Sequence, residues 1–182
     1  MKNYTIILLI SSFLILVNCK SRLINKTEET IGKINKQSVL IDQFKKNGRN
    51  DAFMKSKLYN YQNFEILEAE FFGDTLMRTQ MKIYMKDSLM IKFEHYGLRG
   101  SDARLGKEKP YAKVFSEIYY FESPRKGILK YKEIKIKNFS AFKKAKSDLD
   151  KIKFEITEVN QNDYEMVLRN YVDLIQLHNK TN

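Results

Sequence analysis

Few residues in this chain of 182 carry the chemistry that enzymes commonly use, since it has two histidines and one cysteine. His95 is the histidine best placed for a site, because it lies just before a glycine-rich segment. Glu94, Asp102, Arg99 or Arg104 could join it there. A general base needs a positioned partner, however, and the sequence does not specify which of these side chains is one. A half-buried polar residue at a strand end is the commoner role of such a histidine.

Glutamates form the second candidate group, at Glu65, Glu68 and Glu70. On a strand, Glu68 and Glu70 share one face at a spacing of about 6.6 Å, which overlaps the carboxyl separation of glycosidases. Acids on a solvated strand face beside lysines have the same spacing. The second interpretation is favoured, because lysines are frequent in this region.

Methionines form a third group, at Met77, Met81, Met85 and Met90. Three of them alternate on one strand face over about 26 Å, which is too far for one soft metal ion. Core packing is therefore the better interpretation. A single cysteine excludes a Cys-based zinc site, and no EF-hand loop, HExxH pair or phosphate loop is present. The sequence predicts a protein that is not an enzyme and that binds no metal or cofactor.

The cysteine follows an apolar segment at the start of the chain. Lys2 supplies a positive charge, and Tyr4–Val17 form an apolar stretch of 14 residues. A membrane span needs about 20 residues, so this length favours a secretory signal peptide. A buried core helix and an uncleaved anchor helix are the alternatives.

Residues Leu16-Val17-Asn18-Cys19 resemble the lipobox of bacterial lipoproteins, although Asn18 stands where that family usually has Gly, Ala or Ser. The resemblance implies that Cys19 receives a diacylglyceryl group, that the chain is cut before it, and that the new N-terminus is acylated, for example with palmitate. Two acyl chains suffice for stable anchoring. Lys20 is compatible with the outer membrane, since an Asp there would imply retention in the inner one. The expected organisation is a signal peptide (residues 1–18), a lipidated tether (19–25) and one domain (26–182).

The chain is basic, with 33 Lys and Arg against 22 Asp and Glu, or +11. Removal of Lys2 with the signal peptide leaves 32 − 22 = +10. Lysines outnumber arginines, whereas nucleic-acid readers use arginine heavily, so no nucleic-acid partner is expected. The charge suits an anionic envelope component or a protein partner. Simple solubility is the competing explanation.

Apolar periodicity predicts an α+β domain. A helical stripe runs to Phe44, and alternation then predicts strands over 64–72, 77–86 and 89–94 as an antiparallel meander. Strands are also expected over 112–121 and 128–137, the second with a bulge near Lys132-Glu133, and over 154–159. Helices are expected over 141–153, capped by Ser140, and from Asn162. The expected architecture is a β-meander of five or six strands, with an N-terminal helix and two C-terminal helices packed on one face.

These observations favour a membrane-anchored, non-catalytic binding module of unknown ligand, of which an immunity-type protein is one form. The contact region would be the loop Gly97–Tyr111, with Arg99, Asp102, Arg104 and the adjacent His95. The alternative is an enzyme that modifies an envelope polymer with His95 and nearby carboxylates. An enzyme should place His95 against an acid within a pocket, whereas a binding module should show an exposed patch instead.

Overall fold

A computed structural model of the chain describes residues 2–47, 53–72, 77–100, 112–137 and 141–179. The chain forms two compact units, residues 1–37 and residues 38–182. The first unit is a single helix, α1 (Lys2–Gln37), which continues from the apolar segment past Cys19. None of the helices in the described part of the chain combines the length and apolar character needed to cross a membrane. The helical stripe expected to reach Phe44 ends at Gln37, since the next residues form a strand.

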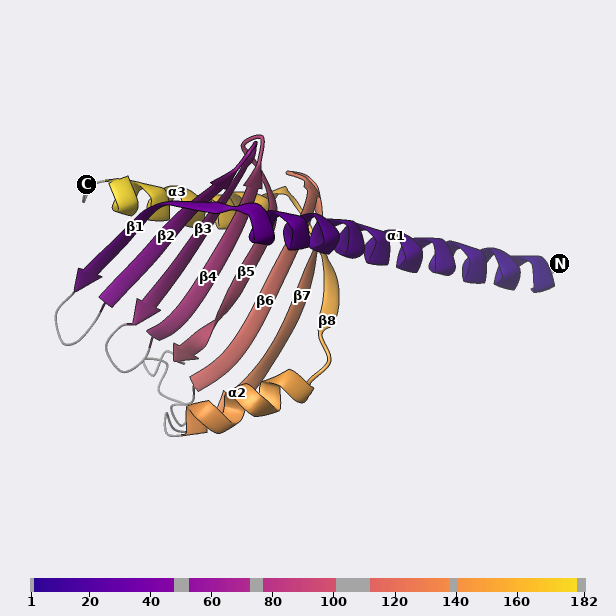
Figure 1. Cartoon of the computed structure of the whole chain (residues 1–182). Coiled ribbons are helices and arrows are strands. Elements are labelled where there is room, and N and C mark those ends of the chain that lie inside the picture. Colours follow the sequence, from indigo (N-terminus) through magenta and orange to yellow (C-terminus); the bar gives the residue numbers. More distant parts are fainter. Residues whose placement is uncertain (1, 48–52, 73–76, 101–111, 138–140, 180–182) are drawn as a thin grey trace. The chain divides into compact units, whose positions relative to one another are not determined.

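The second unit is built on an antiparallel sheet of eight strands in sequence order (Figure 1). The strands are β1 (Val39–Asn47), β2 (Phe53–Tyr61), β3 (Phe64–Phe72), β4 (Met77–Lys86), β5 (Leu89–Gly100), β6 (Ala112–Ser123), β7 (Lys126–Ile136) and β8 (Glu155–Val159). Helices α2 (Phe142–Lys151) and α3 (Gln161–Asn179) flank β8 in the sequence. The α+β class and the meander are confirmed, but the predicted count of five or six strands is too low.

The two strands that sequence reasoning missed are β1 and β2. Strand β1 contains the residues that had completed the helical stripe, Leu40, Ile41 and Phe44. It is the edge strand of the sheet, so Val39 and Ile41 remain 69% and 57% exposed and give no clear alternation. A register irregularity between Leu40 and Asp42 disturbs the pattern further.

Helices α2 and α3 pack on opposite faces of the sheet, which corrects the expectation that they share one. Val167 and Leu174 of α3 pack with Phe93 and Tyr119. Leu149 of α2 belongs to a separate cluster whose sheet residues are Leu98, Ala112, Val114 and Ile136. Phe93 and Leu98 lie five residues apart on β5, and Val114 and Tyr119 lie five residues apart on β6. Because side chains alternate along a regular strand, the two members of each pair point to opposite faces of the sheet. Figure 1 accordingly shows α2 in front of the strands and α3 behind them. These faces are named the α2 face and the α3 face.

This arrangement also explains the shift of apolar phase along β7, which does not reflect a bulge. Leu129 packs on the α3 face, while Ile134 and Ile136 pack with α2. The register between β6 and β7 is regular through Lys132 and shifts only between Phe121 and Ser123. Apolar residues of β7 therefore pack against α3 near Leu129 and against α2 near Ile134 and Ile136.

The last helix begins slightly earlier than expected. The Asn160 side-chain oxygen accepts a hydrogen bond from the backbone N–H of Asn162 at 2.8 Å, and the Asp163 carboxylate accepts one from the N–H of Asn160 at 2.8 Å. Asn160 and Asp163 thus form a reciprocal cap at the start of α3, which begins at Gln161 rather than at the expected Asn162. The predicted cap Ser140 lies outside the described residues.

Candidate functional site

The predicted site residues fall on different parts of the sheet. His95 and Arg99 lie on the α3 face of β5, whereas Glu94 alternates to the α2 face. The predicted loop Gly97–Tyr111 begins later than expected, because β5 continues to Gly100. Asp102 and Arg104 lie outside the described residues, as does the side chain of Cys19. Of the proposed contact residues, the structure therefore places only His95 and Arg99.

His95 sits at the centre of a hydrogen-bonded cluster that spans three strands. Its Nδ1 lies 3.2 Å from Glu117 Oε2, and its Nε2 lies 2.7 Å from Thr79 Oγ1. Arg99 reaches the other Glu117 oxygen at 3.9 Å. The side chains of His95 and Glu117 are only 14% and 15% exposed. The partner of His95 is therefore Glu117, which directly faces it in the β5–β6 register.

Aromatic rings surround this cluster. The Phe115 ring meets the His95 ring edge to face at 4.8 Å between centroids, and the Arg99 guanidinium lies 4.5 Å from the Phe115 centroid. The sequence offered one signal for Glu117, namely a lone carboxylate between the apolar residues Phe115 and Tyr119 on one strand face. Finding its partner required the β5–β6 register, which a long intervening segment concealed.

The order hydroxyl, imidazole, carboxylate matches the logic of a nucleophile, its base and an orienting acid. Thr79, however, is 7% exposed, and its hydroxyl oxygen also lies 3.3 Å from the carbonyl oxygen of Tyr96. Both ring nitrogens of His95 already have partners within the fold. Buried polar groups are normally paired in this way, so the cluster is also what sheet packing alone requires.

A second polar group extends the same face of the sheet. Lys113 Nζ lies 2.8 Å and 2.9 Å from the two Glu133 oxygens, and the Tyr131 hydroxyl also donates to Glu133. Burial opposes ionisation of Glu133, but its hydrogen bonds with Lys113 and Tyr131 outweigh this and lower its pKa below the usual value. Burial, reinforced by Glu133, raises the pKa of Tyr131. The charges of Lys113 and Glu133 at this end of the α3 face therefore neutralise each other.

An open groove of about 300 Å³ lies over β2–β5 and is lined mainly from the α2 face. The register sets its floor in two rows across the strands, Lys57–Glu68–Lys82–Glu94 and Lys55–Glu70–Gln80–Tyr96. Ala69 and Met81 complete the lining. Glu68 and Glu70 share this surface, as their spacing predicted, while Lys55 and Lys57 come from β2, a strand that the sequence did not predict.

The acidic groups of the groove are each engaged. Lys82 Nζ lies 2.8 Å from Glu68, whose carboxylate also accepts a hydrogen bond from Tyr59 at 3.3 Å. Glu70 accepts one from the Gln80 amide at 3.3 Å. Burial of Lys82 favours its neutral form, but its hydrogen bond with Glu68 and its interaction with Tyr84 outweigh this and raise its pKa. Glu68 is therefore ion-paired and Glu70 is bound to an amide, while Glu94, the third carboxylate of the lining, pairs with Lys92 at 2.5 Å.

The cations at the β2 end of the groove differ from Lys82. Within the described part of the chain, neither Lys55 nor Lys57 has an ion pair. Lys45 of β1 lies directly opposite Lys55 in the register and on the same face. The groove is thus polarised, with paired charges in its middle and lysines at its β2 end.

A scan against protein-family models, a search of curated proteins and a search of solved structures found no match to this chain. Among the described residues, no group of three or more His, Cys, Asp or Glu side chains is placed to hold a metal ion. The geometry of the two polar regions is therefore what a functional proposal rests on.

Proposed function

We propose that this protein is a membrane-anchored envelope lipoprotein that acts as a non-catalytic binding module, with the groove on the α2 face as its ligand site. The observation that carries the proposal is the open polar groove over β2–β5. Ligand sites are typically concave and orient their ligands with a few converging polar groups. The groove replaces the loop around Arg99 as the proposed contact region, because His95 and Arg99 are already engaged by Glu117.

Anchoring rests on Cys19 and the lipobox-like residues before it. The acylated Cys19 would hold the protein in the bilayer, most simply at the outer membrane, and would place the basic domain near anionic envelope components. The intact mass tests this, because a mature chain beginning at Cys19 with added acyl mass supports it. Cys19→Ser should release the protein from membranes, and an unmodified chain beginning at Met1 would refute the anchoring.

Ligand occupancy can be tested with a single introduced thiol, since Cys19 is the only cysteine and is acylated in this proposal. Gln80→Cys places a thiol in the floor of the groove, and Lys137→Cys places one on an exposed residue after β7. The full-length variants are purified in a non-ionic detergent and labelled with a maleimide, with and without extract of the producing cell envelope. We expect the extract to slow labelling at position 80 several-fold and to leave position 137 unchanged. Equal rates at position 80 with and without extract would contradict the proposal.

The second candidate is an enzyme that modifies an envelope polymer, and the contact of His95 with Glu117 and Thr79 favours it. This candidate predicts that the purified protein cleaves an envelope glycan or peptide, and that His95→Gln and Thr79→Val abolish the cleavage. Gln80→Ala, in the groove, serves as the control. If no turnover occurs with the native protein, or if turnover survives His95→Gln, this candidate fails.

A further inference from the structure

Three lysines lie on one face at the β2 end of the groove: Lys55 and Lys57 line it, and Lys45 lies beside it on β1. Lys45 and Lys55 lie directly opposite each other across β1 and β2, and Lys57 follows two residues along β2. Like charges in directly opposed positions of a sheet are destabilising, and opposed Cβ atoms lie about 4.5–5.5 Å apart. One bound anion could therefore contact two of these ammonium groups at once and relieve their repulsion.

The middle of the groove offers a different chemistry. Glu70 and Gln80 form a neighbouring pair of hydrogen-bonding side chains, and Glu68 with Lys82 forms the next. These groups could exchange hydrogen bonds with a polyhydroxylated ligand. A bare inorganic anion would use only the lysine end and would leave this part of the groove unused.

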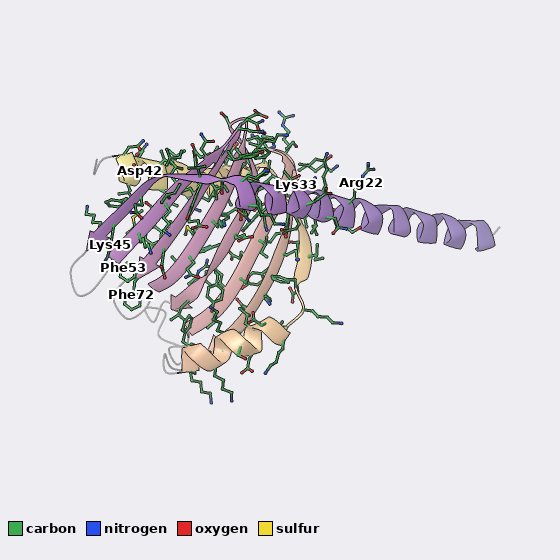
Figure 2. The ribbon with its side chains drawn as sticks, viewed as in Figure 1. Arg22, Lys33, Asp42, Lys45, Phe53 and Phe72 are labelled. Carbon is green, nitrogen blue, oxygen red and sulfur yellow. The ribbon has the colours of Figure 1, made fainter. Side chains whose placement is uncertain are left out.

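An aromatic pair borders the lysine end. Phe53 and Phe72 stack with ring centroids 5.3 Å apart, one row beyond Lys55 and Glu70 in the β2–β3 register and on the same face. Figure 2 shows both rings near the end of the sheet where Lys45 lies. They are half-buried, so part of their surface is accessible to a ligand. The C–H face of a sugar ring is apolar and packs against such a surface.

Resting on the proposed function, we infer that the groove binds an anionic saccharide, with its phosphate or carboxylate between Lys45, Lys55 and Lys57. The ring hydroxyls then meet Glu70 and Gln80, and the apolar ring face lies toward Phe53 and Phe72. Lysine is well suited to a phosphate as a mobile point charge. The groove volume of about 300 Å³ is at the lower end of small-molecule sites, which suits a single charged sugar unit.

The inference is tested by ligand-observed NMR titration of the full-length protein in a non-ionic detergent. The probes are glucose 6-phosphate, glucuronate, glucose, inorganic phosphate and a short phosphoserine peptide. We expect at least one of the two anionic sugars to bind about tenfold more tightly than glucose, phosphate and the peptide. Its affinity should fall as ionic strength rises, because Lys45 and Lys55 are solvent-exposed.

Matched variants locate the anion. Lys45→Ala/Lys55→Ala should weaken binding of the anionic sugar at least tenfold. Lys46→Ala/Lys137→Ala removes the same charge from β1 and from the segment after β7, and should change the affinity less than about twofold. Lys46 is a stringent control because it neighbours Lys45 but points to the α3 face. Equal losses in the two double variants would overturn the inference, since general charge would then explain the binding.

Other outcomes also decide the matter. Phosphate or the phosphopeptide binding as tightly as the anionic sugars would overturn recognition of a saccharide. Failure of both anionic sugars to bind, together with envelope extract that still protects Gln80→Cys, would overturn this inference and leave the binding module intact. Failure of both experiments would remove the proposed function as well.

Discussion

The two faces of the sheet carry polar clusters that are built differently. On the α3 face, His95 and Glu117 are 14% and 15% exposed, and both ring nitrogens of His95 have partners. On the α2 face, Lys82 and Glu68 are 26% and 36% exposed and line an open groove, with lysines at its β2 end. The first cluster contains the residue types that suggest catalysis, whereas the second contains ordinary surface residues.

The difference follows from the cost of burial. Burying a polar group without a hydrogen-bond partner costs about 1–3 kcal/mol of stability. The polar groups of a buried cluster therefore tend to form hydrogen bonds with one another. Groups in an open groove can exchange water for a ligand without that constraint. The two clusters should therefore respond in opposite ways to substitution, with stability depending on the α3 face and binding depending on the α2 face.

The largest expected effect is that of Glu117→Ala. This change leaves the largely buried His95 without its carboxylate partner, and we expect it to lower the free energy of unfolding by about 2–3 kcal/mol. Glu70→Ala in the groove should lower it by no more than about 0.5 kcal/mol. Urea denaturation followed by circular dichroism measures both.

The same two variants should reverse their order in binding. Glu70→Ala should weaken binding of the ligand that protects the thiol of Gln80→Cys. Glu117→Ala should leave this binding unchanged when it is measured at a temperature where the variant is folded. If Glu117→Ala left stability unchanged but abolished an activity, the α3 face would be the functional one.

A smaller contrast separates the two hydroxyl groups of these clusters. Thr79→Val removes the partner of His95 Nε2 at nearly constant volume and should cost about 1 kcal/mol of unfolding free energy. Tyr59→Phe removes the hydrogen bond to Glu68 in the groove, where water and Lys82 can replace it, and should cost less than about 0.5 kcal/mol. Equal costs would mean that burial does not distinguish the clusters.

The fold was predictable from the sequence wherever one helix covers one face of a strand consistently. Strand β4 is such a case, because Met81, Ile83 and Met85 all face α3. Strand β7 is not, because α3 covers one face near Leu129 and α2 covers the other near Ile134. Such a change of covered face has the same sequence pattern as a bulge. The edge strand β1 was not predicted for a related reason, since its apolar residues are largely exposed and show no regular alternation.

The candidate site was less predictable than the fold. His95 could be singled out by residue type, but its partner Glu117 lies on β6, whose register with β5 is not set by a short turn. The groove is assembled from four strands, of which β2 had not been expected at all. Lys55 and Lys57 acquire a role only when β2 pairs with β3 and aligns them with Glu70 and Glu68. Pairing across strands, rather than any local motif, creates this site.

The dependence of stability on pH also separates the two faces. The pKa of Glu133 on the α3 face is lowered, so its contribution to stability is present above the ordinary value of 4.5 and is lost as pH falls through its folded pKa. The pKa of Lys82 in the groove is raised, so its contribution is present below the ordinary value of 10.5 and is lost as pH rises through its folded pKa. Both groups are partly solvated, so each contribution should stay below about 1 kcal/mol.

Unfolding free energies measured at pH 3.5, 7 and 11 should show that Glu133→Gln flattens only the acid side of the stability profile and that Lys82→Gln flattens only the alkaline side. Loss of both slopes in either variant would mean that the two faces are electrostatically coupled through the sheet, and the contrast between them would have to be abandoned.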